Sequence, residues 1–310
     1  MEQKIILAGT YTDSGSEGIY SFACEDGKLS APVLYAKIGS PKYISIQNGL
    51  VASIGKFERG AGAAVFDRSG TMLGKAEYES RTSCFITWHG DDIYTANYHE
   101  GTFTKLHFSG DALTVEKTVS IKEGAGCHQV LFLNDRILVP CLFLDRLMIF
   151  NSDLEYQGSV VFPDGTGPRH GVFSKDQSTL YLISELSNEL FVLNTEDWSL
   201  KASIPVLKDG RTHLRGGAAV RLSDDGTLLY VSTRGQDLIS VIDLERMTVL
   251  QDAYCGGKHP RDFILADNAV LCANRYSDTV VAFSRNPDGT IGAEAGRINI
   301  PQAVSRAVMD

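Results

Sequence analysis

Short apolar segments alternate with polar turns along the whole chain, and they recur in one fixed order. Each copy starts at a small residue or a proline and contains two apolar segments, the second ending in small residues, followed by an alternating segment. Six copies open with "PKYISIQNGLVASIG", "SCFITWHGDDIYTAN", "CHQVLFLNDRILVPC", "PRHGVFSKDQSTLYLIS", "GAAVRLSDDGTLLYVST" and "PRDFILADNAVLCAN". Such short runs predict β-strands, and helical periodicity is nearly absent.

The spacing of the copies predicts a β-propeller. The apolar residues that close them are Phe66, Leu106, Phe150, Val192, Ile242 and Phe283, and Phe22 stands one period earlier. A period of about 40 to 50 residues built from short strands is typical of propeller blades with four antiparallel strands each. The apolar strand positions are therefore expected to form the core.

The two ends of the chain supply the parts of a seventh copy. "KIILAGTYT" and "GIYSFAC" read as strands at the start, and "PQAVSRAV" resembles the opening strand of another copy. We expect these strands to share one blade and close the ring without a free edge. The fold prediction is an all-β, seven-bladed β-propeller that forms a single domain over residues 1–310. A polar insertion, "VLKDGRTHLRGG", separates the fourth and fifth copies and is expected to cover a site.

Charge and cysteine usage narrow the classes of partner. The net charge of -9 argues against a surface built to bind nucleic acid or anionic lipid. No signal peptide or membrane span is recognisable, and the six cysteines show no CxxC pair. These features favour a cytoplasmic protein whose cysteines are buried and reduced. Cys127, next to His128, is the exception to watch.

Polar residues interrupt the repeat at two equivalent places. The first column, at the copy starts, contains Tyr43, Phe85, His128, Arg169 with His170, Ala218 and Arg261. The second column follows the strand that ends in small residues and contains Asn97, Cys141, Glu185, Arg234 and Arg275. Inner strands of a propeller line its central channel, so these side chains should converge at one end, with Arg215 nearby on the insertion.

Several arginines around one carboxylate suggest an anion site, because guanidinium groups suit phosphate and carboxylate. The alternative is that the arginines form ion pairs between blades with aspartates such as Asp145, Asp237 and Asp278. Glu185 should stay ionised and could activate a water, as could His128, and the sequence does not choose between them. No nucleotide-binding or nucleophile motif is present, and the histidines lack metal-ligand spacing. We therefore predict neither a metal nor a cofactor.

The chain resembles the seven-bladed propeller lactonases over essentially its whole length. The likeness rests on "GTYTDSGSEGIY", "GCHQVLFLNDRILVPCLFLDRLMIF", "GTGPRH", "SEL" and "PRDF…ANRYSDTVVAF" in this order. It also resembles the fungal carboxymuconate-lactonising enzymes. That resemblance implies an active site of His128, Arg169, Glu185 and a second arginine, Arg234 or else Arg261. Family members often carry histidine where this chain has Cys84 and the "GCH" of residues 126–128, which bears on substrate identity.

The resemblance implies a metal-independent lactonase. The predicted substrate is a small anionic sugar lactone, 6-phospho-D-glucono-1,5-lactone, which is hydrolysed to 6-phosphogluconate. Water would attack with help from Glu185 or His128, and an arginine, Arg169 by preference, would stabilise the oxyanion. The substrate-binding candidates are Arg234, Arg261, Arg275, Arg215, His170 and Asn97. Strand alternation is expected to turn His170 away if Arg169 faces the channel. The alternatives are a non-enzymatic scaffold that binds an anion or a protein, and a muconate-type cycloisomerase.

Overall fold

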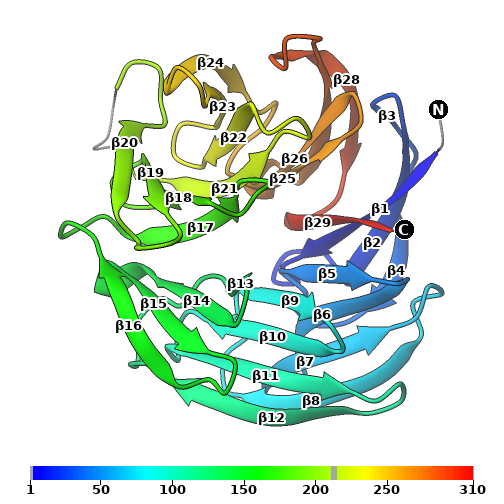
Figure 1. Cartoon of the computed structure of the whole chain (residues 1–310). Coiled ribbons are helices and arrows are strands. Elements are labelled where there is room, and N and C mark those ends of the chain that lie inside the picture. The colour runs from blue at the N-terminus through cyan, green and yellow to red at the C-terminus, as the bar shows by residue number, and fades with distance from the viewer. Residues whose placement is uncertain (1–2, 211–214, 310) are drawn as a thin grey trace.

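Seven antiparallel β-sheets surround a central axis in the computed structural model of the chain (Figure 1). The structure describes residues 3–210 and 215–309. Six sheets are each built from four consecutive strands, and we number them as blades 1 to 6 in chain order. This architecture confirms the predicted all-β, seven-bladed propeller.

The first strand of each of these six blades is the innermost one (Figure 1). Blade 1 contains β5 (Ile44–Gln47), β6 (Leu50–Lys56), β7 (Ala61–Phe66) and β8 (Met72–Glu79). Blade 2 contains β9 (Phe85–His89), β10 (Asp92–Asn97), β11 (Thr102–Phe108) and β12 (Leu113–Ser120). Blade 3 contains β13 (Leu131–Leu133), β14 (Arg136–Cys141), β15 (Arg146–Asn151) and β16 (Tyr156–Val161).

The second half of the ring repeats this pattern. Blade 4 contains β17 (Pro168–Phe173), β18 (Thr179–Ser184), β19 (Glu189–Asn194) and β20 (Leu200–Pro205). Blade 5 contains β21 (Gly217–Leu222), β22 (Leu228–Thr233), β23 (Leu238–Asp243) and β24 (Thr248–Tyr254). Blade 6 contains β25 (Pro260–Ala266), β26 (Ala269–Asn274), β27 (Thr279–Arg285) and β28 (Ile291–Asn299).

Blade 7 joins the two ends of the chain, as predicted. Its innermost strand is β29 (Ala303–Met309), which pairs with β1 (Lys4–Thr10). The outer strands are β2 (Gly18–Glu25), then β3 (Lys28–Leu29) and β4 (Val33–Lys37), both paired with β2. The helical segments of the described chain are two 3-10 turns, η1 (Leu142–Leu144) and η2 (Arg275–Ser277). Neither is long or apolar enough to cross a membrane.

The core lies between the blades. Among the described residues, buried apolar side chains gather in seven clusters, one at each interface between neighbouring sheets. Strands such as β26 are buried on both faces because a sheet packs on either side, which explains their continuous apolar sequence. All six cysteines are buried and free, as predicted, and Cys127 Sγ lies 3.7 Å from Cys141 Sγ.

The residues that close the repeats are all buried on third strands, which agrees with their predicted role in the core. In blade 4, however, the equivalent residue is Leu193 rather than Val192. The register shift between the third and fourth strands falls at Lys105/Leu106 in blade 2 and at Val192/Leu193 in blade 4. The fourth repeat therefore closes one residue later than its sequence suggests.

A β-bulge interrupts the pairing of the first two strands in blades 4, 5 and 6. In blade 4 the extra residue is Arg169, and in blade 6 it is Arg261. Blade 5 has the same irregularity at the start of β21. A bulge re-aims the side chain that it carries, and bulges are common next to functional sites. The two arginines therefore enter the axial region from equivalent points of the fold.

Candidate active site

Glu185 lies directly after β18, and arginines from two neighbouring blades bind the same oxygen of its carboxylate. Arg169 Nε donates to Glu185 Oε2 at 2.8 Å, and Arg234 Nη2 lies 2.7 Å from that oxygen. The Glu185 N–H donates to Gly167 O at 2.8 Å. The Arg234 N–H donates to Gly216 O, also at 2.8 Å. We call Arg169, Glu185 and Arg234 the Glu185 group.

The Glu185 group is internally paired, and solvent reaches it from one side. Burial opposes ionisation of Glu185, but Arg169 and Arg234 outweigh it and lower the pKa of the carboxyl. Burial and the charge of Arg234 lower the pKa of Arg169 to about 10, so Arg169 and Glu185 are both charged at neutral pH. The side chains of Glu185 and Arg234 are 17% and 18% exposed, whereas that of Arg169 is 1% exposed. Arg234 and Glu185 therefore form the accessible face, and Arg169 lies behind them.

His128 and His170 form a buried pair beside this group. His128 Nδ1 lies 3.0 Å from His170 Nε2, and both rings are nearly inaccessible. Burial and the charge of Arg169 hold the pKa of each histidine well below its usual range, so both are neutral. The expectation that alternation turns His170 away is wrong. The bulge at Arg169 breaks the alternation, so that Arg169 bonds Glu185 while His170 bonds His128.

Tyr11, which follows β1, is surrounded by three cationic side chains. Arg261 Nη1 donates to Tyr11 Oη. The guanidinium carbons of Arg275 and Arg261 lie 3.8 Å and 5.3 Å from the centroid of the Tyr11 ring. Lys42 Nζ lies 5.6 Å from the same centroid. We call Tyr11, Lys42, Arg261 and Arg275 the Tyr11 group.

The two groups are electrostatically coupled. The charge of Arg261 contributes to lowering the pKa of Glu185, Arg169 and His128. Burial raises the pKa of Tyr11, but Arg261 and its neighbours outweigh burial and lower it. The two groups thus share one electropositive region.

Three residues of this region were missed by sequence analysis: Tyr11, Lys42 and His259. Lys42 had a signal, since "PK" at 41–42 matches "PR" at 168–169 and 260–261. The predicted column contains Tyr43 at this place, one position after the residue that corresponds to Arg169. His259 packs against Tyr276 with ring centroids 4.2 Å apart and the ring planes tilted by 37°. Burial and the charge of Arg234 lower its pKa to about 3.

Two predicted residues take other positions. Asn97 is buried, donating to Arg81 O at 2.7 Å and accepting from the N–H groups of His99 and Glu100. It therefore holds the turn after β10. Arg215 is exposed, and its backbone oxygen lies beside Gly235. Residues 211–214 of the insertion expected to cover the site lie outside the described residues.

The aspartates considered as partners for these arginines bind backbone instead. Asp145, Asp237 and Asp278 each accept a hydrogen bond from a backbone N–H of a later loop, at 2.7–2.8 Å. Within residues 3–210 and 215–309, none of the three forms an ion pair with an arginine. Ion pairing between blades through these aspartates therefore does not account for the arginines.

A second ionic network lies on the inner strands. Arg221 Nη2 donates to Asp262 Oδ1 at 2.6 Å, and Arg306 Nη2 donates to the backbone oxygen of Asp262. The Arg221 side chain also bonds Tyr43, whose pKa is raised to about 12 chiefly by burial. These groups support the inner strands of blades 5, 6 and 7.

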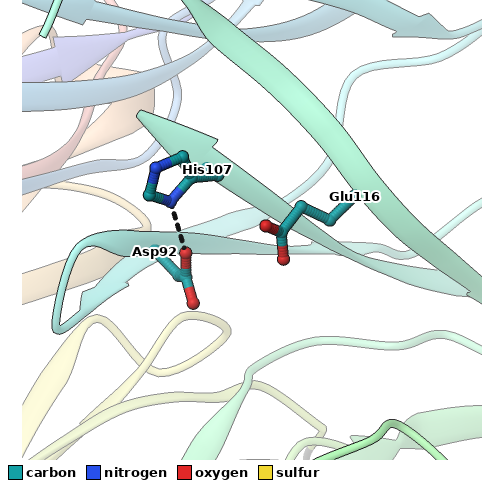
Figure 2. A group of neighbouring side chains, drawn as sticks. All are labelled: Asp92, His107 and Glu116. Carbon is teal, nitrogen blue, oxygen red and sulfur yellow. Dashed lines mark hydrogen bonds and ion pairs between the residues drawn. The ribbon is translucent and has the colours of Figure 1, made fainter. Parts of the chain in front are cut away.

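Among the residues that the structure describes, one group of side chains has metal-ligand character, and it lies outside this region. Asp92, His107 and Glu116 come from three adjacent strands of blade 2, and their donor atoms lie within 4.8 Å of one another (Figure 2). Lys105 Nζ is 2.9 Å from Asp92 Oδ2 and 2.7 Å from Glu116 Oε2. Lys105 therefore already neutralises the two carboxylates, and a metal ion would have to displace its ammonium group.

The fold and the site define a seven-bladed propeller in which arginines from two blades meet one carboxylate beside the inner strands. A sequence profile of the family described as Lactonase, 7-bladed beta-propeller matches residues 5–307. The chain belongs to this lactonase family. It is 28% identical to the 6-phosphogluconolactonase of Bacillus subtilis (strain 168), covering 98% of this chain and 96% of the relative.

Solved structures agree with the fold. A protein from Lactobacillus plantarum superimposes with a TM-score of 0.92 at 26% identity, with both chains fully covered. The periplasmic gluconolactonase of Pseudomonas aeruginosa gives a TM-score of 0.89 at 23% identity, covering 100% of this chain and 99% of that one. At this identity the second likeness speaks for the fold alone.

Proposed function

We propose that the protein hydrolyses 6-phospho-D-glucono-1,5-lactone to 6-phosphogluconate without a metal, by attack of a water activated at Glu185. The observation that carries the proposal is the geometry of the Glu185 carboxylate. Both arginines bind Oε2, and no donor in the described part of the chain is bonded to Oε1. An ionised carboxylate with one free oxygen can accept a proton from water.

Glu185 is better supported than His128 as the base. Its side chain is 17% exposed, whereas His128 is 4% exposed. Neutral His128 is bonded through Nδ1 to His170, which suits it to orient the water or relay a proton. The proton taken by the base would return to the ring oxygen as the lactone C–O bond breaks.

Arg234 is better supported than Arg169 as the group that meets the oxyanion. Arg169 donates to Glu185 and to Ala218 O and is almost inaccessible. Its charge instead keeps Glu185 ionised. Arg234 has one guanidinium edge on Glu185 and is partly exposed, so another N–H can stabilise charge that develops on the lactone carbonyl.

The phosphorylated substrate is supported by the surplus of cations and by the activity in the name of the Bacillus subtilis relative. Of the remaining substrate-binding candidates, Arg261 and Arg275 lie in the Tyr11 group and would hold the phosphate. The predicted partner is thus a small anionic lactone, and we expect neither nucleic acid nor membrane as a partner. A cytoplasmic location fits this substrate.

The test follows proton release from freshly made 6-phosphogluconolactone at pH 7, with spontaneous hydrolysis as the baseline. Wild type should exceed this baseline, and Glu185→Gln should lose about 10²–10⁴-fold of the excess, the range expected for a general base. Glu189→Gln is the matched control, because Glu189 lies on the same blade and bonds Ser203. EDTA should change neither rate.

Other outcomes identify the alternatives. A wild-type rate equal to the spontaneous one on every lactone tested would leave a binding scaffold. Turnover of muconate but not of sugar lactones would indicate a cycloisomerase.

A further inference from the structure

The cations of the site divide into a balanced set and an unbalanced set. In the Glu185 group, Arg169 and Arg234 share one carboxylate at 2.8 Å and 2.7 Å. In the Tyr11 group, three cations surround a phenol, and no carboxylate among the described residues forms an ion pair with any of them. Clustered like charges without a counter-ion cost stability, so such a cluster is typical of a site built for an anion.

Each cation of the Tyr11 group donates to an oxygen that does not belong to a carboxylate. Arg261 donates to Tyr11 Oη, and Arg275 Nε donates to Gln302 Oε1 at 3.0 Å. Lys42 Nζ donates to Thr82 O at 3.1 Å. These bonds orient the side chains but give none of the three cations an ion-pair partner, and the charge of Glu185 acts on Arg261 only without direct contact. The other N–H donors of Lys42 and Arg275 have no bonded partner among the described residues.

Glu79 is the carboxyl group in electrostatic range of Lys42, and it does not neutralise the lysine. Its carboxylate accepts from the Ser83 N–H at 3.0 Å and from the Ser83 hydroxyl. Burial raises the pKa of Glu79 to about 7, so the group is only partly ionised at neutral pH.

We propose that Lys42, Arg261 and Arg275, which surround the Tyr11 ring, form the subsite for the phosphate of the substrate. This inference rests on the proposed lactonase function and refines it. Lys42 is the residue that it adds, and Arg234 is assigned to the lactone carbonyl instead. A phosphate monoester carries nearly two negative charges at pH 7, and three cations suit it better than they suit a neutral hydroxymethyl group.

The first test measures binding of the product, which requires no turnover. Calorimetry would compare 6-phosphogluconate with gluconate on wild type, Lys42→Gln and Lys42→Arg. Glutamine keeps a donor for Thr82 O but removes the charge. Wild type should bind 6-phosphogluconate at least ~30-fold more tightly than gluconate, Lys42→Gln should lose ~10-fold or more of this preference, and Lys42→Arg should keep most of it.

The control is Lys201→Gln. Lys201 also donates to a hydroxyl and to a backbone oxygen, Thr179 Oγ1 at 2.9 Å and Ser178 O at 3.5 Å, but on the outer strand of blade 4. This variant should match wild type. Equal affinity of wild type for the two acids would overturn the subsite, and so would a Lys42→Gln loss that is the same for both.

The second test separates the subsite from the proposed chemistry. Lys42→Gln should lower kcat/KM at least ~10-fold more for 6-phosphogluconolactone than for glucono-1,5-lactone, mainly through KM. If wild type hydrolyses neither lactone, the proposed function fails, while the calorimetric comparison still decides the subsite. If both lactones are hydrolysed and lose kcat/KM by the same factor in Lys42→Gln, the function stands and the subsite fails.

Discussion

The Glu185 group and the Tyr11 group use the same kind of side chain for opposite purposes. Arg169 is nearly inaccessible and ends on a carboxylate, whereas Arg261 ends on a phenol. Both arginines occupy the bulge position of their blades, so their backbone settings are equivalent. The difference lies in the partner. An arginine that is paired with a carboxylate inside the protein stabilises the fold, whereas an arginine without an ion-pair partner is available to bind a ligand.

The largest effect on stability should come from removing Arg169, whose charge is paired with Glu185. Arg169→Met leaves the partly buried Glu185 with one cation and Ala218 O without its donor. Breaking a buried pair by removing one partner costs about 3–5 kcal/mol, so urea denaturation should show a loss of this size. A loss below about 1 kcal/mol would mean that the ion pairs of the Glu185 group do not stabilise the fold.

The protein should lose folding stability in acid, because the arginines around its buried histidines oppose their protonation. Burial and neighbouring arginines lower the pKa values of His128, His170 and His259. As the pH falls below about 6.5, the unfolded chain takes up protons that the folded chain does not. The stability from these groups is therefore present above pH 6.5 and is lost below it, by up to about 1.4 kcal/mol per pH unit for each histidine.

Denaturation at pH 7.0, 6.0 and 5.0 measures this slope. His170→Gln should reduce it, and His89→Gln, which changes an exposed histidine on β9, should not. The Glu185 carboxyl acts in a different window. Since its pKa is lowered from 4.5, its contribution is present above that value and disappears only as the pH falls through the lower folded pKa. A stability that stays level down to pH 5 would contradict the neutral histidines.

Removing Arg261, which has no ion-pair partner, should have a smaller effect on stability. Arg261→Met keeps the aliphatic stem and relieves repulsion with Lys42 and Arg275, so the free energy of unfolding should change by less than about 1 kcal/mol in either direction. Binding of 6-phosphogluconate should weaken by at least ~10-fold in calorimetry. If Arg261→Met destabilised the protein as much as Arg169→Met, the two groups would not differ in purpose.

The sequence repeat was enough to predict the fold, but it predicted only some of the site residues. Blade order and closure followed from short strands at a fixed period, because each blade must bury the faces of its neighbours. Arg169, Glu185 and Arg234 were found because they lie in repeat columns and match a family pattern. The direction of His170 was not predictable by alternation, since a bulge leaves no mark in the sequence. Tyr11 and Arg261 meet only because the ring closes.

The smallest effect should come from the Lys105 cluster of blade 2, which resembles the Glu185 group in composition but not in burial. Lys105 joins Asp92 and Glu116, and the three side chains are 24%, 24% and 42% exposed. Solvent screens these partly exposed pairs more than it screens Arg169, so Lys105→Met should cost less than about 1 kcal/mol, and the loss should shrink in high salt. Lactonase activity should match wild type, because the cluster lies on β10, β11 and β12 and makes no contact with the Glu185 or Tyr11 group. A loss as large as that of Arg169→Met would mean that burial does not decide how much an ion pair stabilises this protein.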